Sequence, residues 1–142
     1  MREVSRMHWI YDGKEIEALD SDDRFRDCIG FVYVIRCRIN GKGYIGKKLF
    51  KFKKTRQVKG KKKKILVESD WKDYYSSSQE LKDDVVKYGK EHFDREIIHL
   101  CKYKGTLNYL ELREQIDRRV LENDGWYNGF VGSKIHKSHV RL

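Results

Sequence analysis

The stretch from residue 30 to residue 50 constrains the fold of this chain more than any other. Residues 30–38 are rich in β-branched and aromatic side chains, and residues 43–50 resume the same pattern. Between them stands Asn40-Gly41, a dipeptide typical of the type I′ turn, in which both central residues need a positive φ. The pattern predicts a β-hairpin with Tyr33 in its first strand and Tyr44 in its second.

The second half of the chain shows signals for a helix followed by a strand. Ser77 and Glu80 have the spacing of a capping box, in which a hydroxyl caps the helix and an acid follows three residues later. Apolar residues then recur at helical spacing until Gly89, where a C′ glycine ends a helix. Residues 93–100 have the composition of a third strand.

A second helix is expected over residues 107–121, because Leu112, Ile116 and Val120 recur at i, i+4 and i+8. Strands and helices do not alternate strictly along the chain. Their order therefore indicates a small α+β fold, a three-stranded antiparallel sheet flanked by helices, with a basic insertion after the first hairpin.

The 142 residues suffice for one domain. We expect an N-terminal extension over residues 1–29, in which Asp12-Gly13 marks a turn, a main domain over residues 30–135 and a C-terminal tail over residues 136–142. No apolar run approaches the roughly 20 residues of a membrane span, and the N-terminus lacks an apolar signal segment. The expected location is the cytoplasm, or the host cytoplasm if a phage encodes the chain.

The positive charge is confined to one segment. Residues 47–64 contain 11 of the 32 basic residues and no acid, whereas the rest of the chain carries 21 basic residues against 22 acidic ones. This density favours a polyanion partner over a merely solvated charge run, although lysine contacts phosphate far more than base sequence. The expected DNA-binding residues are Lys48, Lys51, Lys53, Lys54, Lys59, Lys61, Lys62, Lys63 and Lys64.

Two tripeptides in the hairpin resemble the paired signature of the GIY-YIG nuclease superfamily. They are residues 31–33 (Phe-Val-Tyr) and 44–46 (Tyr-Ile-Gly); the second matches literally, and the first keeps only its tyrosine. Further on, the run that starts at Tyr109 and contains Glu111, and the Tyr-Asn that ends at Asn128, resemble the acidic residue and terminal motif of the family. The closest likeness is to small freestanding, phage-type homing endonucleases.

The resemblance implies a metal-dependent DNA endonuclease that hydrolyses phosphodiester bonds in duplex DNA. One Mg²⁺ (or Mn²⁺) is the implied cofactor, and Glu111 is its implied ligand, with Glu114 one helical turn away as the alternative. Asn128 belongs to the implied catalytic set. No small-molecule cofactor and no membrane partner are expected, and the oligomeric state stays open.

The resemblance also implies that Tyr33 or Tyr44 positions or deprotonates the attacking water. A tyrosine has an ordinary pKa of about 10, so this chemistry calls for cations nearby that lower it. Lys47 and Lys48 directly follow the second tripeptide and are expected to do so.

The phosphate-binding arginine of the family usually lies on a helix after the second tyrosine. Lys54 occupies that position here, the nearest arginine is Arg56, and the surrounding sequence is not helical. Either Arg56 serves, or Lys47 takes over, or the segment has been rebuilt as a DNA-binding hairpin. We favour Arg56 together with Lys47.

Two other classes of function explain part of the sequence. A non-catalytic nucleic-acid-binding module derived from such a nuclease accounts for the basic segment and for the altered first tripeptide. A protein-interaction domain accounts for the lysines alone. Metal-dependent cleavage of DNA distinguishes the nuclease from both.

Overall fold

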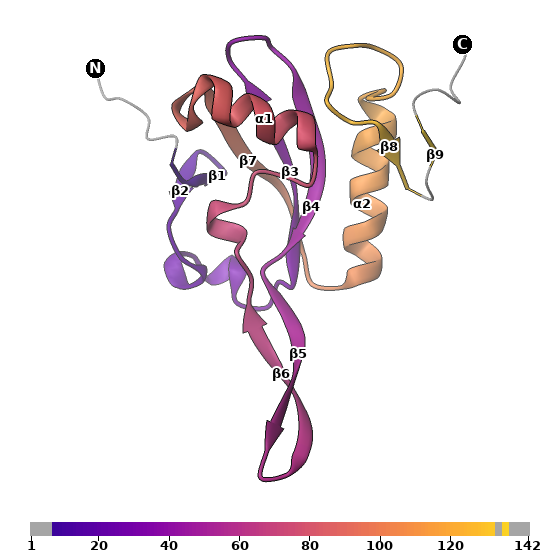
Figure 1. Cartoon of the computed structure of the whole chain (residues 1–142). Coiled ribbons are helices and arrows are strands. Elements are labelled where there is room, and N and C mark those ends of the chain that lie inside the picture. Colours follow the sequence, from indigo (N-terminus) through magenta and orange to yellow (C-terminus); the bar gives the residue numbers. More distant parts are fainter. Residues whose placement is uncertain (1–6, 133–134, 137–142) are drawn as a thin grey trace.

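The computed structural model describes residues 7–132 and 135–136 and shows a mixed α+β fold with a long projecting ribbon (Figure 1). The strands are β1 (Trp9–Tyr11), β2 (Lys14–Ile16), β3 (Gly30–Cys37), β4 (Gly43–Leu49), β5 (Lys51–Val58), β6 (Lys61–Glu68), β7 (Phe93–Cys101), β8 (Phe130–Val131) and β9 (Ile135–His136). The helices are α1 (Gln79–Tyr88) and α2 (Lys104–Asp117), and short 3-10 turns lie at Leu19–Ser21, Asp23–Phe25, Trp71–Asp73 and Lys90–His92. Most of the expected C-terminal tail, residues 137–142, lies outside the described residues.

The central sheet has five strands in the order β2-β1-β7-β3-β4, so the expected three-stranded antiparallel sheet is corrected. The three expected strands are present, but β1 pairs in parallel with β7 and brings β2 with it. Asp12 and Gly13, with φ of 51° and 76°, close the β1–β2 hairpin in a type I′ turn. Trp9 is fully buried and packs edge-on against Phe31, so the N-terminal strands share the main core.

The hairpin expected over residues 30–50 is confirmed by the pairing of β3 with β4. The expected type I′ turn is wrong, because it needs a positive φ at both central residues and only Gly41 in the connecting loop has one, of 74°. The Asn40 side chain accepts a hydrogen bond from the Lys42 amide and donates one to the hydroxyl of Tyr127. The loop between Cys37 and Gly43 is longer than a two-residue turn, and its Asn40 side chain contacts a residue that is distant in the sequence.

Both expected helices are present, with shifted details. Ser78, not Ser77, caps α1 by accepting from the Leu81 amide, and Gly89 ends the helix with a φ of 94°. The apolar stripe expected on the second helix is wrong: Leu112 and Ile116 are 37% and 55% exposed. Neither helix, in the part of the chain that the structure describes, is long and apolar enough to cross a membrane.

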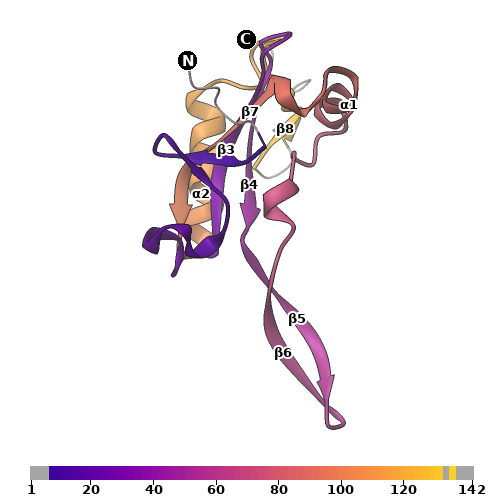
Figure 2. The same cartoon turned by 90° about the vertical axis from the view of Figure 1, so that its left-hand side faces the viewer.

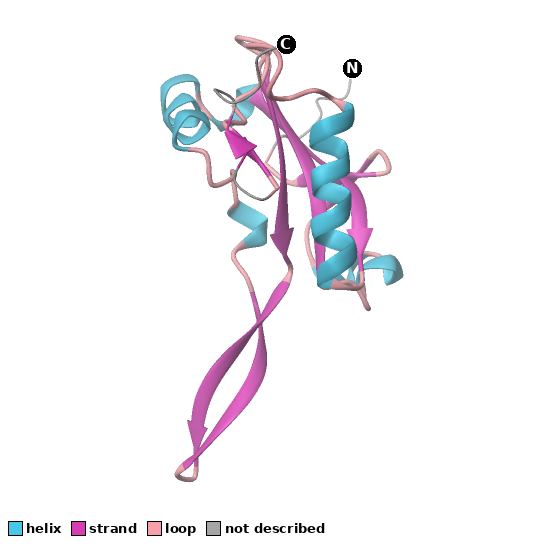
Figure 3. Cartoon of the chain, turned by 90° about the vertical axis from the view of Figure 1, so that its right-hand side faces the viewer, coloured by secondary structure: helices cyan, strands magenta, loops and turns pink. Residues whose placement is uncertain are grey.

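The two helices lie on opposite sides of the sheet (Figures 2 and 3). On the α1 side, the buried cluster is dominated by aromatic side chains, which include Phe31, Tyr33 and Trp71. On the α2 side, Val32 and Ile45 pack against Leu107. Strand β4 forms one end of the sheet, so side chains of either face can reach that open edge.

Strands β5 and β6, which contain most of the basic segment, form a two-stranded ribbon that projects from the body as a free arm (Figures 1 and 2). Its turn consists of Lys59 and Gly60, whose φ values of 52° and 75° make a type I′ turn between Val58 and Lys61. Of the three alternatives for this segment, the structure shows a hairpin.

Candidate active site at the open edge of the sheet

The second tripeptide ends in a glycine because the ring of the tyrosine opposite it leaves no room for a side chain. Tyr33 of β3 lies directly across from Gly46 of β4. A Cβ atom at Gly46 would lie 2.5 Å from the Tyr33 hydroxyl and 2.7 Å from the ring of Tyr44. Glycine leaves the space that brings the two rings together, with centroids 6.1 Å apart and an interplanar angle of 29°.

Two residues from the segment before α1 complete the group around the tyrosines. The Tyr44 hydroxyl lies 3.3 Å from Oγ of Ser77, which is available because Ser78 caps the helix instead. The ring of Tyr74 stands edge-on to Tyr33, with centroids 6.1 Å apart. Sequence reasoning missed both residues as part of the site. The one signal for Ser77 was the run of hydroxyl residues ahead of the helix.

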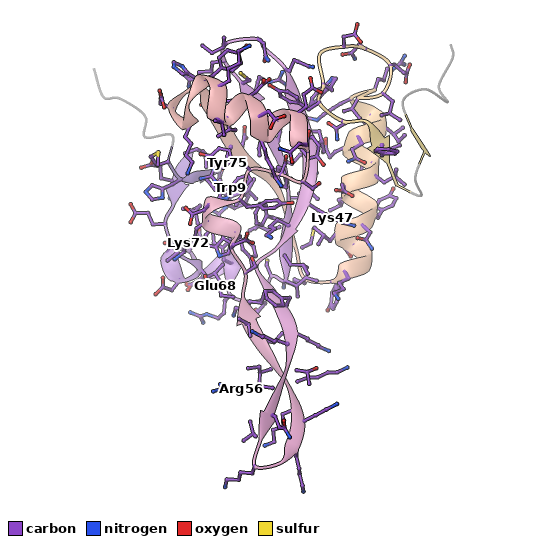
Figure 4. The ribbon with its side chains drawn as sticks, viewed as in Figure 1. Trp9, Lys47, Arg56, Glu68, Lys72 and Tyr75 are labelled. Atoms are coloured by element: carbon purple, nitrogen blue, oxygen red, sulfur yellow. The ribbon has the colours of Figure 1, made fainter. Side chains whose placement is uncertain are left out.

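A buried arginine anchors the segment that carries Tyr74. Arg95 of β7 is 2% exposed and donates to the carbonyl oxygen of Tyr74 at 2.9 Å. It also donates to Met7 at 2.8 Å, and its guanidinium lies over the rings of Trp9 and Tyr75, both labelled in Figure 4. The N-terminal strand and the 72–75 segment are thereby tied to the central strand behind the tyrosines.

The pKa of both hairpin tyrosines is raised rather than lowered. Burial raises the pKa of Tyr33 well above its ordinary value, and the neighbouring tyrosines and Glu111 add to the effect. Burial likewise raises the pKa of Tyr44, although the hydrogen bond with Ser77 opposes it. The expectation that Lys47 and Lys48 lower these pKa values is wrong, because burial raises both and neither lysine is among the groups that act on the two phenols.

Each of the two lysines that follow the Tyr-Ile-Gly tripeptide forms an ion pair with a different acid. Lys47 alternates to the α2 side of β4, where its Nζ lies 3.7 Å from Oε1 of Glu111 and donates to Oδ1 of Asn108. Lys48 points to the α1 side, where its Nζ lies 2.6 Å from Asp70 and 4.0 Å from the ring centre of Tyr74. Asn108, one helical turn before the glutamate, was not expected from the sequence.

The two candidate glutamates occupy different environments. Glu111 has a side chain only 18% exposed, and burial raises its pKa although Lys47 opposes the effect. Its charge in turn raises the pKa of both hairpin tyrosines, so it lies within electrostatic reach of them. Glu114 bonds His99 at 2.7 Å and Arg118 at 2.9 Å. Burial would raise the pKa of Glu114, but these two partners hold it below its ordinary value.

A cavity of about 440 Å³ adjoins this group at the root of the ribbon. Leu49 and Leu107 form its apolar wall, and Lys47, Lys48 and Lys104 bring three cations to it. The cavity lies between the first turns of α2 and the place where β4 continues into β5, and Lys47 in its wall lies 3.7 Å from Glu111.

The structure does not bring Arg56 to this group. The residue is exposed in the middle of β5, and Figure 4 shows it on the projecting ribbon, far from Lys47. The other expected DNA-binding lysines, except Lys48, lie on the ribbon or its turn, and all are exposed: Lys51, Lys53, Lys54, Lys59, Lys61, Lys62, Lys63 and Lys64.

Asn128 is placed behind the site rather than in it. The residue is 2% exposed, and its side chain accepts from the amide of Ile45 at 3.1 Å and donates to the Ile45 carbonyl at 2.8 Å. Gln115 of α2 donates to the same carbonyl at 3.0 Å. Both side chains pair with the open edge of β4 next to Tyr44 and fix its position.

The donor set at Glu111 suits a hard, strongly hydrated cation. The described residues contain no cluster of three or more His, Cys, Asp or Glu side chains that could enclose a metal. Mg²⁺, however, commonly binds through one or two carboxylates and keeps waters or substrate phosphate oxygens as its other ligands. A single half-buried carboxylate with a raised pKa, paired with a lysine at 3.7 Å, fits that mode.

Comparison with known protein families identifies a model that covers most of the chain. The family model described as "Putative endonuclease segE, GIY-YIG domain" matches residues 9–131. The match begins at the first residue of β1 and ends at the last residue of β8, so it includes both N-terminal strands and the ribbon. No curated protein and no solved structure matches the chain.

Proposed function

The chain belongs to the GIY-YIG nuclease superfamily, as a SegE-type endonuclease domain, and from this premise we propose that it cleaves duplex DNA by metal-dependent phosphodiester hydrolysis. The observation that carries the proposal is the position of Glu111. The carboxylate lies 3.7 Å from Lys47 and close enough to Tyr33 and Tyr44 to raise the pKa of each. A carboxylate, a cation and two phenols thus gather at one edge of the sheet.

Glu111 is the proposed ligand of one Mg²⁺ or Mn²⁺. A bound divalent ion would supply charge neutralisation at the scissile phosphate and at the leaving oxygen. The raised pKa of Glu111 shows that its carboxylate lacks full solvation, so a cation gains more from binding there than at an exposed acid. Glu114, whose oxygens already bond His99 and Arg118, is the weaker candidate.

Tyr44 is the proposed residue that orients the attacking water. Its raised pKa favours the neutral phenol, which can donate one hydrogen bond and accept another. Tyr33 is 1% exposed, so it supports the ring of Tyr44 and does not itself reach solvent. Positioning of water, rather than its deprotonation by a tyrosinate, follows from these environments.

Lys47 is the proposed contact to the scissile phosphate, and Lys48 is its neighbour on the other face of β4. Lys47 is 40% exposed, borders the cavity at the ribbon root and already faces Glu111. It therefore takes the role expected of an arginine, while Arg56 contacts DNA farther along the duplex. Asn128 acts through Ile45 as a positioning residue.

A plasmid-cleavage assay tests the proposal. Wild-type protein should convert supercoiled DNA to nicked or linear DNA with Mg²⁺ and should not do so with EDTA. Glu111→Gln should abolish cleavage and retain DNA binding, whereas the matched variant Glu114→Gln should stay active. An inactive Glu114→Gln beside an active Glu111→Gln would move the metal ligand by one turn. Salt-sensitive binding without cleavage by the wild type would instead establish a non-catalytic nucleic-acid-binding module.

A further inference from the structure

The ribbon formed by β5 and β6 holds its charge away from the rest of the molecule. Every residue of β5 is exposed, and in β6 only Ile65 and Val67 are partly covered. No ion pair among the described residues includes a cation of the ribbon. An isolated two-stranded hairpin is marginally stable, and closely spaced cations repel each other. The arm is therefore a surface that needs a polyanion.

The register of the ribbon divides its side chains between two unlike faces. Thr55 pairs with Lys64 and Gln57 with Lys62, so these four share a face, and Lys51 and Lys53 continue it toward the root. Leu66 and Glu68 lie at the root end of this face, and the other apolar residues, Phe52, Val58, Ile65 and Val67, lie on the opposite face. Beyond the Lys53–Leu66 pair toward the tip, the first face is formed by cationic and hydrogen-bonding side chains, and we call it the polar face.

The dimensions of the ribbon match one groove of DNA. Its strands are eight residues long, which at about 3.4 Å per residue spans roughly 27 Å, or about 8 base pairs. The major groove of B-DNA is about 12 Å wide and admits a two-stranded β-ribbon, whereas the minor groove is only about 6 Å wide. Lysines on such a ribbon reach the phosphates that border the groove.

Two neutral residues of the polar face are suited to base edges. The amide of a glutamine can bond N6 and N7 of adenine in the major groove, and the methyl group of a threonine can contact that of thymine. Thr55 and Gln57 lie four and six residues beyond Lys51, the first residue of the arm. At about 3.4 Å per residue they stand roughly 14 to 20 Å, or about 4 to 6 base pairs, from the ribbon root.

We propose that the β5–β6 ribbon lies in the major groove of duplex DNA and reads base edges with Thr55 and Gln57, to one side of the cleavage position. The proposal rests on DNA as the substrate under the proposed function. The ribbon root adjoins the cavity that Lys47 and Lys48 line, and Lys47 lies 3.7 Å from Glu111, so the bases that are read and the bond that is cut stand at a fixed offset. The arm would supply specificity that the lysines alone cannot.

Selection from a random duplex pool in EDTA tests base reading without any need for catalysis. Wild-type protein should enrich a preferred sequence, and Thr55→Ala/Gln57→Ala should lose that preference while its affinity for the unselected pool stays within about threefold of the wild-type value. Gln79→Ala, which changes an exposed glutamine at the start of α1, is the matched control and should select the wild-type sequence. A wild-type pool without enrichment, or an unchanged preference in the double variant, would overturn the proposal.

Base analogues in the selected duplex then identify the groove. Replacement of adenine and guanine by their 7-deaza analogues removes an acceptor from the major groove and should weaken binding at least tenfold. Replacement of guanine by inosine removes only the minor-groove amine and should have little effect. The opposite pattern would contradict the proposal.

Hydroxyl-radical footprinting on the same duplex measures the offset. Protection should extend about 8 base pairs from the cleavage position on one side only, and symmetric protection would overturn the arrangement. Cleavage by a protein that shows no base preference would refute this inference and leave the nuclease intact. Major-groove preference without cleavage would support this inference and refute the proposed nuclease activity.

Discussion

Replacement of Gly46 by alanine tests whether the two hairpin tyrosines depend on the space beside that glycine. The added Cβ would lie 2.5 Å from the hydroxyl oxygen of Tyr33, 2.6 Å from its Cζ and 2.7 Å from Cε1 of Tyr44. Gly46 lies within β4 and has no positive φ, so alanine adds no backbone strain of its own. Any effect comes from the collision.

The size of the effect follows from how little the rings can move. Carbon atoms normally approach to about 3.5 to 4.0 Å, so the neighbours must retreat by roughly 1 Å. Tyr33 is 1% exposed, and the rings of Trp9 and Tyr74 lie 5.1 and 6.1 Å from its centre. Overpacking of a core costs about 1 to 3 kcal/mol, and three simultaneous clashes place this change near 3 kcal/mol. At about 3 °C per kcal/mol, the melting temperature should fall by roughly 9 °C.

Urea unfolding, followed by circular dichroism and by tryptophan fluorescence, measures the loss directly. Gly105→Ala is the matched control, because nothing lies within 4 Å of a Cβ at that helical position. Alanine there should stabilise the protein by about 0.5 to 1 kcal/mol. Below its own melting temperature, Gly46→Ala should still cleave plasmid DNA far more slowly than the wild type. An unfolding midpoint and a cleavage rate equal to those of the wild type would refute the reasoning.

Further substitutions probe the groups around the site. Asn128→Ala should destabilise the fold by about 1 to 3 kcal/mol in urea unfolding, because the Ile45 amide loses its buried partner and the Ile45 carbonyl keeps only Gln115. The pKa of Glu114 is lower in the folded than in the unfolded state, so its contribution to stability is present above the unfolded pKa and is lost as pH falls through the folded pKa. Glu114→Gln should therefore make the urea midpoint depend less on pH in the acid range. The pKa of Glu111 is raised in the folded state, so ionisation of its carboxyl group lowers stability as pH rises through the unfolded pKa. At neutral pH, Glu111→Gln should therefore have a melting temperature no lower than that of the wild type, although it loses cleavage. Lys62→Gln/Lys64→Gln should lower the slope of log affinity against log salt by about 2, measured by titration of duplex DNA, and an unchanged slope would place those lysines away from phosphate.

Local patterns predicted the elements whose formation depends on neighbours in the sequence. The hairpin of residues 30–50, the strand that begins at Phe93 and the glycine that ends α1 were all correctly predicted. In each case the signal comes from residues that contact each other within a few positions.

The predictions that failed depended on contacts between distant segments. Residues 1–29 gave no hint that β1 would pair with β7, more than 80 residues later, since a strand of three residues is too short to show a period. The apolar stripe that contains Leu112 was expected to face the core. In the structure α2 instead turns Gln115 toward the sheet, where the Gln115 amide donates to the edge of β4. Burial of the hairpin tyrosines likewise reversed the pKa shift expected from the adjacent lysines.

The sequence by itself determined the α+β class, the hairpin tyrosines and the confinement of positive charge to residues 47–64. These properties are local, since they follow from side-chain type, spacing and charge along the chain. Only the tertiary structure decided that Glu111 faces Lys47 while Glu114 bonds His99, and that Arg56 stands on a free arm. Those outcomes depend on how α2 and the ribbon leave the sheet. Packing across the whole chain determines that geometry, because no short segment contains both partners.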